Sequence, residues 1–199
     1  MKLIYDYQQR TNSSAGVLKA CCTFILLLFV TFYAFSQRPY LYGLTTNGSG
    51  GYGSVFRTDT GGQHFEILDS FTAIENGKNP FPQKLIEVNS KLYGIITNGG
   101  KNYKGVLFEY NPSNNNFVVK HHFSDSTGSN PAGDLLLASN GNLYGTTIGG
   151  GPADHGTIFE FNPTTGVLKK IATFKVPTTG AGPRGKMVEK TGNIYGTGE

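Results

Sequence analysis

The sequence predicts an all-β protein made of tandem four-stranded antiparallel blades of a β-propeller, with about three blades in an incomplete, open arc. The main observation is a Leu/Ile-Tyr-Gly triplet that occurs four times, with its first residue at positions 41, 92, 143 and 194, always 51 residues apart. A period near 50 is typical of propellers and related repeat arrays. The second observation is that Gly, Asn and Thr are abundant and that no stretch after residue 36 has helical periodicity, which favours turn-rich β-structure.

The repeat divides the chain into copies 41–91, 92–142 and 143–193 and the start of a further copy at 194–199. Other residues keep the same phase, because Phe108-Glu109 returns as Phe159-Glu160 and Gly105 returns as Gly156. Residues 37–199 are therefore treated as one propeller-like repeat region.

Each copy is expected to form four short strands, named A to D in chain order. In the third copy these are residues 135–138, 143–147, 157–161 and 167–174. A two-residue turn at Asn140-Gly141, where both residues tolerate positive φ, joins A to B, and Asn162 to Gly166 form the turn between C and D. The next strand A is expected at 186–189.

The glycine of each triplet falls inside strand B, at Gly43, Gly94, Gly145 and Gly196. A glycine inside a strand often marks a close approach of other atoms. We expect neighbouring blades to approach there. The tyrosines before these glycines are expected to be core residues; they are Tyr42, Tyr93, Tyr144 and Tyr195.

The first 36 residues predict a signal peptide. Lys2, Arg10 and Lys19 precede an apolar run at 20–35, which ends in Ala34-Phe35-Ser36. Cleavage after Ser36 would release a secreted or cell-surface protein. The alternative is an uncleaved anchor, so contact with a membrane is expected only through this leader. Both cysteines, Cys21 and Cys22, lie inside it.

Charge and motif content argue against several functions. Removing three basic residues and one acidic residue with the leader reduces a net charge of +4 to about +2, without a basic cluster, so nucleic-acid binding is not expected. Residues 48–53 match the dinucleotide pattern G-x-G-x-x-G but lead into a strand instead of the required helix. The adjacent His121 and His122 point to opposite faces of a strand. We expect no catalytic set, no metal site and no cofactor.

The strand count leaves the ring open. The chain holds strands B-C-D, A-B-C-D, A-B-C-D and A-B, whereas four blades are the usual minimum for closure. Open sheet edges favour association. The favoured interpretation is a truncated piece of a longer protein, and the alternative is a protomer that self-associates through its open blade edges.

The repeat resembles the GloVer tandem-repeat family of exported bacterial proteins. The resemblance covers residues 41–199 and is carried by 143–147, Gly149-Gly150, 156–159, Pro163, Gly166, Phe174 and Pro183-x-Gly185. Residues 95–96 and 57–59 depart from the pattern. The resemblance implies a propeller-like, secreted or surface protein with more copies than this chain has, and it implies no established activity.

The predicted function is a non-catalytic binding or scaffold module with a glycan or protein ligand. The B–C and D–A loops are the long ones and share one end of each blade, where functional residues tend to gather. The candidate binding residues on this long-loop face are Asn47, Tyr52, Asn98, Tyr103, Asp154 and His155. The alternative is an extracellular polysaccharide hydrolase or lyase with Asp134, Asp154 and His155 in a central channel.

Overall fold

The computed structural model describes residues 39–48, 50–72, 75–80 and 83–198, so the predicted signal peptide lies outside the described residues. The repeats lie within one compact unit, Leu41–Glu199. The described residues form thirteen β-strands and no helix. Accordingly, this part of the chain has no helix of the length and apolar character needed to cross a membrane.

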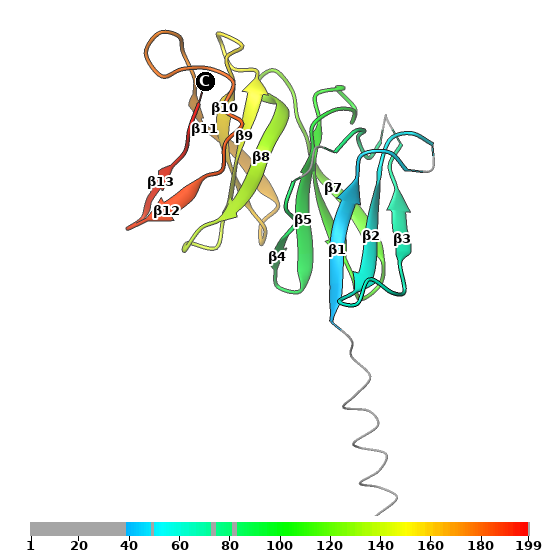
Figure 1. Cartoon of the computed structure of the whole chain (residues 1–199). Coiled ribbons are helices and arrows are strands. Elements are labelled where there is room, and N and C mark those ends of the chain that lie inside the picture. The colour runs from blue at the N-terminus through cyan, green and yellow to red at the C-terminus, as the bar shows by residue number, and fades with distance from the viewer. Residues whose placement is uncertain (1–38, 49, 73–74, 81–82, 199) are drawn as a thin grey trace, which may run out of the picture. The chain divides into compact units, whose positions relative to one another are not determined.

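The strands form four antiparallel sheets whose strand order follows the chain, which confirms the predicted division into B-C-D, A-B-C-D, A-B-C-D and A-B (Figure 1). The first sheet contains β1 (Tyr40–Thr45), β2 (Ser54–Asp59) and β3 (Glu66–Ser70). The second contains β4 (Ile86–Val88), β5 (Lys91–Ile96), β6 (Val106–Asn111) and β7 (Asn116–His122). The third contains β8 (Ser129–Leu137), β9 (Leu143–Gly149), β10 (Thr157–Asn162) and β11 (Val167–Thr173). The last contains β12 (Val188–Lys190) and β13 (Asn193–Tyr195).

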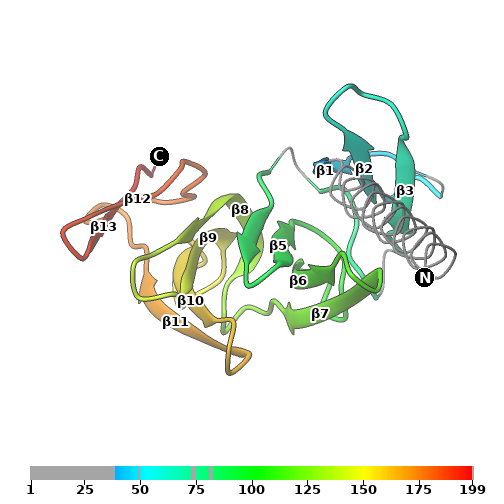
Figure 2. The same ribbon diagram turned by 90° about the horizontal axis from the view of Figure 1, so that it is seen from below.

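These sheets are the blades of a β-propeller, and they are not closed into a ring. The second and third blades lie side by side, with β5 in contact with β8 (Figure 2). Strand β8 begins at Ser129, six residues earlier than predicted, because its pairing with β9 continues past an irregularity between Ala132 and Leu136.

The turns between strands A and B show one departure from prediction. Asn89-Ser90 and Thr191-Gly192 have positive φ at both residues, which is typical of two-residue type I′ hairpins. In the third blade only Gly141 has positive φ, and the Ala138 N–H donates to the Asn142 carbonyl at 3.0 Å. The predicted two-residue turn at Asn140-Gly141 is therefore wrong, and the loop is one residue longer, with glycine at its left-handed position.

The strand-B glycines are covered by phenylalanines of the same blade. Gly94 pairs with Phe108 and Gly145 pairs with Phe159 across the B–C ladder. A Cβ at Gly94 would lie 2.6 Å from the Phe108 ring, and one at Gly145 would overlap the Phe159 ring. The predicted approach of a neighbouring blade at these glycines is thus wrong, because the paired strand supplies the covering ring.

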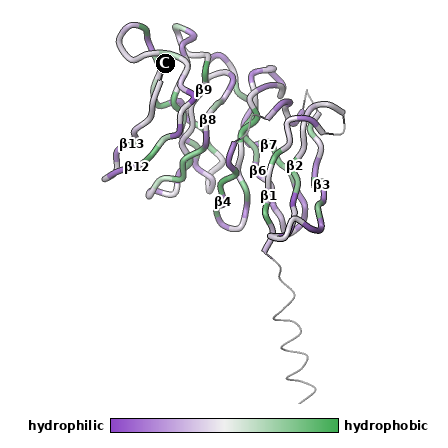
Figure 3. Tube along the Cα trace, in the orientation of Figure 1, coloured by the Kyte–Doolittle hydropathy of each residue, from purple (hydrophilic) through white to green (hydrophobic). Residues whose placement is uncertain are grey.

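Adjacent blades instead pack through aromatic side chains that recur in each copy. The residue that follows strand D packs on the strand-C phenylalanine of the next blade. The ring centroids are 6.2 Å apart for Phe71 and Phe108 and 5.1 Å apart for Phe123 and Phe159. All four rings are buried, and hydrophobic segments lie within the strands in Figure 3.

The predicted core role of the strand-B tyrosines holds for the two complete blades. Tyr93 and Tyr144 are buried, and Tyr42 is half-buried. Tyr195 is 55% exposed, because β13 pairs only with β12 in its sheet, so the prediction is wrong for this residue.

Candidate functional site

A backbone hydrogen bond between successive blades recurs three times, and it positions the segments whose residues line the candidate site. The N–H groups of Asn79, Asn130 and Gly182 donate to carbonyls of the preceding B–C loop. The acceptors are Tyr52, Lys104 and His155, at 2.9, 2.8 and 2.9 Å, respectively. All three donor residues have positive φ, a conformation that Asn and Gly adopt most readily. We call each of these contacts a blade junction.

A glycine and a proline complete each junction. The proline after the donor residue packs against the glycine that opens strand C of the preceding blade; the pairs are Gly53 with Pro80, Gly105 with Pro131, and Gly156 with Pro183. The three glycines have φ values of 97°, 96° and 99°. A Cβ at Gly105 would lie 2.5 Å from Pro131 Cδ and 2.6 Å from the Ile96 carbonyl oxygen. The junction thus requires glycine and holds the segment after each proline in place.

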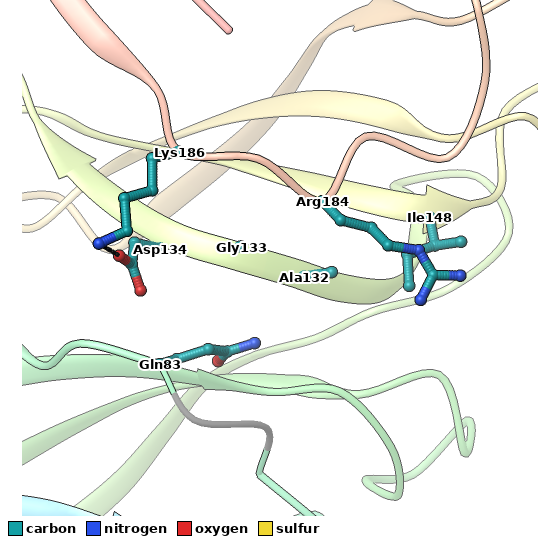
Figure 4. A pocket seen from close by; sticks show the side chains of 7 residues that line it. All are labelled: Gln83, Ala132, Gly133, Asp134, Ile148, Arg184 and Lys186. Atoms are coloured by element: carbon teal, nitrogen blue, oxygen red, sulfur yellow. Dashed lines mark ion pairs between the residues drawn. The ribbon is translucent and has the colours of Figure 1, made fainter. Parts of the chain in front are cut away.

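The third residue after each junction proline lines a pocket. These residues are Gln83, Asp134 and Lys186, one from each of three successive copies. The pocket has a volume of about 240 Å³ and is completed by Ala132, Gly133, Ile148 and Arg184 (Figure 4). We call it the inner-strand pocket, because its walls come from β8, the end of β9 and the segments that lead into β4 and β12.

Asp134 connects the walls of the inner-strand pocket. Its Oδ1 accepts a hydrogen bond from the Lys84 N–H at 2.9 Å, and its Oδ2 pairs with Lys186 Nζ at 3.3 Å. The Asp134 side chain is 19% exposed, whereas the Lys186 side chain is 82% exposed. The carboxylate is therefore held from two sides, and the ammonium group keeps most of its contact with solvent.

Gln83 has unusual surroundings for an amide. Its side-chain nitrogen and oxygen are both shielded from solvent and have no hydrogen-bond partner in the described part of the chain. Leaving a buried polar group unpaired costs about 1–3 kcal/mol. Figure 4 shows this side chain facing β8 across the pocket. Buried amide atoms without a partner are rare in folded proteins.

The residues predicted on the long-loop face have several different environments. Asn98 is half-buried between blades, where its Oδ1 accepts from Asn130 Nδ2 at 3.1 Å. Asp154 is exposed, and its Oδ1 accepts from the Gly150 N–H at 2.5 Å. The carbonyls of Tyr52 and His155 belong to blade junctions.

Asn47 and Tyr103 are exposed to solvent on the B–C loops of the first and second blades. Tyr103 is 59% exposed and has a positive φ of 56°. The three residues named for a catalytic channel have separate partners, since Asp134 contacts Lys84 and Lys186 whereas Asp154 and His155 bond within the B–C loop and the third junction.

Comparison with known proteins identifies the family. The model of the Gloeobacter/Verrucomicrobia repeat matches residues 34–199. The chain belongs to the Gloeobacter/Verrucomicrobia repeat family. This confirms the resemblance that the sequence motifs indicated. No curated protein sequence matches this Gloeobacter/Verrucomicrobia repeat chain.

Three solved structures are similar to this chain, and the first of them supports the fold. The extracellular domain of a one-component system from B. thetaiotaomicron has a TM-score of 0.53 and 18% identity, over 78% of this chain and 18% of that one. A puromycin-hydrolyzing peptidase of Mycobacterium tuberculosis has a TM-score of 0.45 and 14% identity, over 78% and 23%. TolB from Acinetobacter baumannii has a TM-score of 0.43 and 12% identity, over 78% and 36%. The chain thus spans between 18% and 36% of the length of these proteins.

The second and third copies of this chain also contain a tyrosine–glutamate pair that was not predicted from the sequence. The Tyr93 hydroxyl donates to Glu109 Oε2 at 2.6 Å, and the Tyr144 hydroxyl donates to Glu160 Oε1 at 3.0 Å. Lys91 Nζ also contacts Glu109, at 2.8 Å. Strands B and C pair with Gly opposite Phe, so the Tyr before the Gly lies opposite the Glu after the Phe. This antiparallel register is the sequence feature from which the tyrosine–glutamate pair could have been predicted.

The histidines of this Gloeobacter/Verrucomicrobia repeat chain have separate partners. His121 Nε2 lies 3.2 Å from Thr127 Oγ1, and His122 Nδ1 accepts from the Lys101 N–H at 3.2 Å. Burial lowers the pKa of both imidazoles. Among the described residues, no group of three His, Cys, Asp or Glu side chains is placed to hold a metal ion.

Glu109 makes the stability of this chain depend on pH. Burial raises the pKa of the Glu109 carboxyl, but hydrogen bonds from Lys91 and Tyr93 and the charge of Lys120 outweigh it and hold the pKa below its usual value near 4.5. A carboxyl with a lowered folded-state pKa stabilises the fold above its unfolded pKa, and this contribution is lost as pH falls through the folded pKa. Hydrogen bonds to charged groups contribute about 1.5–3 kcal/mol.

We therefore expect Glu109→Gln to lower the free energy of unfolding by about 1–2 kcal/mol at pH 7. The difference should shrink as pH falls from about 4.5 through the lowered folded-state pKa, because the unfolded wild type takes up a proton first and the folded wild type follows. Urea unfolding between pH 3 and pH 8 measures the difference. Glu87→Gln, at an exposed position of β4, is the control and should change little. A difference that stays the same across this pH range would contradict the assignment.

Proposed function

We propose that this chain is a non-catalytic recognition and scaffold module of a secreted or cell-surface protein, and that it binds a glycan or a peptide. The supporting observation is that equivalent positions share one backbone geometry but carry different residues, two of them with exposed side chains. Gly51, Tyr103 and Asp154 all have positive φ, and their N–H groups donate to Gly48, Gly100 and Gly151, respectively. A fixed backbone with variable side chains is how repeat scaffolds form binding surfaces.

The residues that are the same in each copy have a structural role. The junction glycines and prolines hold successive blades together, and the buried phenylalanines fill the space between them. Glu109 and Glu160, the carboxylates that recur in strand C, accept hydrogen bonds from tyrosines of their own blades. The constant part of the repeat therefore acts as framework, which leaves the loop positions for recognition.

Location outside the cytoplasm is part of the same proposal. It is supported by the basic and apolar leader at residues 1–36 and by the similarity to a domain described as extracellular. Contact with a membrane only through the leader, and self-association through open sheet edges, remain predictions.

The proposal is tested by replacing Tyr103 with Gly, the residue found at the equivalent position of the first blade. Glycine adopts positive φ without strain, so we expect stability to change by less than about 1 kcal/mol. An exposed tyrosine on a rigid loop is a typical binding anchor. We therefore expect an affinity for a ligand selected on glycan and peptide arrays to fall at least about tenfold, which corresponds to about 1.4 kcal/mol.

Tyr195→Ser is the matched control, because Tyr195 is about as exposed as Tyr103 but lies in β13. This control should bind like the wild type. Arrays without any specific ligand, or saturable cleavage of a bound polysaccharide, would contradict a non-catalytic recognition module.

A further inference from the structure

A second pocket lies at the end of the third blade where the A–B and C–D turns are. It has a volume of about 330 Å³, and its lining residues are Asn142, Glu160, Asn162, Thr165, Val167 and Lys169. We call it the turn-end pocket. In an antiparallel blade whose strand order follows the chain, the long B–C and D–A loops lie at the other end, so this pocket is separate from the long-loop positions.

Glu160 has one carboxylate oxygen in use and one that is open. Its Oε1 accepts hydrogen bonds from the Tyr144 hydroxyl, at 3.0 Å, and from Asn142 Nδ2. Its Oε2 accepts none from the described residues. Within the described ranges, the shielded side-chain atoms that lack a partner belong to Gln83, so the half-buried Glu160 keeps Oε2 accessible to solvent.

The second blade shows which chemical group this carboxylate position binds. The equivalent Glu109 pairs with the ammonium groups of Lys91, at 2.8 Å, and Lys120, at 3.6 Å. At the corresponding positions 142 and 171 of the third blade, 51 residues later, the sequence has asparagine and isoleucine. Glu160 therefore has the same place in strand C and the same kind of tyrosine partner, but no ion pair with a described residue.

Lys169 brings a positive charge to the turn-end pocket. It lies opposite Glu160 in the β10–β11 ladder, so the two side chains leave the same face of the sheet. Lys169 is exposed and forms no ion pair or hydrogen bond within the part of the chain that the structure describes. The charges of the lining cancel, and each charged group can still bind a group of opposite charge from a ligand.

Two asparagines extend this division into acceptors and donors. Asn142 donates through Nδ2 to Glu160, which leaves its Oδ1 as an acceptor. Asn162 Oδ1 accepts two backbone N–H groups of the following turn, both at 2.9 Å, which leaves its Nδ2 as a donor. The acceptors Glu160 Oε2 and Asn142 Oδ1 suit an ammonium group. The donors Lys169 Nζ and Asn162 Nδ2 suit a carboxylate.

We propose that the turn-end pocket binds a free α-amino acid in its zwitterionic form. The ammonium group of the ligand binds Glu160 and its carboxylate binds Lys169. One carbon joins the two groups of the ligand, which suits a cross-strand pair whose Cβ atoms lie about 4.5–5.5 Å apart. Val167 is 49% exposed and offers an apolar contact to an aliphatic side chain. This inference goes beyond the proposed function and does not depend on it.

The test uses three compounds that share the side chain of valine. L-valine carries both charged groups, L-valinamide lacks the carboxylate, and N-acetyl-L-valine lacks the ammonium group. Protein NMR titration of the full chain at pH 7 should show saturable binding of L-valine. We expect at least about tenfold weaker binding of the other two compounds, because each leaves one charged group of the pocket without a partner. Raising the salt concentration should weaken the binding of L-valine.

Lys169→Gln is the decisive variant, because an exposed lysine without an internal partner can be replaced with little effect on stability. We expect at least about fivefold weaker binding of L-valine and an unchanged melting temperature. Lys170→Gln is the matched control, since Lys170 is the exposed neighbour outside the lining, and this variant should bind like the wild type.

Glu160→Gln tests the other half of the site. The amide keeps an oxygen for Tyr144 and Asn142 but places an NH₂ group where the ammonium group should bind. We expect at least about tenfold weaker binding of L-valine. A melting temperature close to that of the wild type would show that the blade remains folded.

Three results would overturn the inference. They are the absence of saturable L-valine binding, equally tight binding of L-valinamide or N-acetyl-L-valine, and normal binding by Lys169→Gln. None of them concerns the long-loop face, so an array ligand that depends on Tyr103 would leave the proposed recognition function standing. Loss of that dependence with normal L-valine binding would have the opposite meaning.

Discussion

Replacing Gly105 with Ala is expected to lower the free energy of unfolding by about 3–5 kcal/mol, the largest effect we predict for a single substitution. Two costs combine at this residue. Its φ of 96° lies in a region that residues with a Cβ rarely adopt. The added Cβ would also lie 2.5 Å from Pro131 Cδ and 2.7 Å from the Thr97 carbonyl oxygen, so the second and third blades would have to move apart.

Gly51→Ala separates the two costs. Gly51 has a φ of 81°, but a Cβ there would meet no atom within 4 Å. This control should lose only about 1–2 kcal/mol, the cost of the left-handed backbone conformation alone. Urea unfolding measures both variants. Equal losses in the two would mean that the junction does not hold the blades as tightly as the contacts indicate.

Replacing Gly145 with Ala is expected to cost about 2–3 kcal/mol, the second-largest effect. The backbone conformation is compatible with alanine here, so the cost comes from the ring of Phe159, which lies where the new methyl group would be placed. Phe159 cannot turn aside easily, because it is fully buried against Phe123 of the preceding blade.

A double-mutant cycle with Phe159→Leu tests that reason. The smaller side chain leaves room for the alanine, so the double variant should lose at least about 1 kcal/mol less than the sum of the single variants. Gly61→Ala is the control for a glycine with ordinary surroundings, since its nearest atom would be Asp59 Oδ1 at 3.4 Å. Strict additivity of Gly145→Ala and Phe159→Leu would show that the ring is not the obstacle.

The strands could be predicted because their signals are local. Turn residues such as Asn162 to Gly166 and the constant 51-residue spacing mark where each strand begins and ends, and the sheet order follows once strands pair in sequence. The pairing register between strands B and C is set by contacts between residues that are far apart in the sequence. It places Gly145 opposite Phe159, and this explains why the covering ring comes from the same blade and not from the next one.

The candidate site could be predicted only in part. Exposure of Tyr103 follows from its place on a long loop, but the junction role of the Tyr52 and His155 carbonyls depends on contacts between blades. The inner-strand pocket was missed because its members differ from copy to copy. Gln83 has a neutral amide and Lys186 has an ammonium group. The only feature they have in common is their position, three residues after a junction proline.

The central proposal is that the blade junctions form a framework, and that the loop residues on it bind a ligand without changing it chemically. The most direct measurement is saturation-transfer NMR of an array-selected glycan or peptide mixed with the full chain, with the ligand spectrum followed for a day. We predict saturation transfer from the protein to the ligand, loss of most of this transfer in Tyr103→Gly, and a ligand spectrum that does not change with time. New product signals that grow with time, or no saturation transfer to any selected ligand, would contradict it.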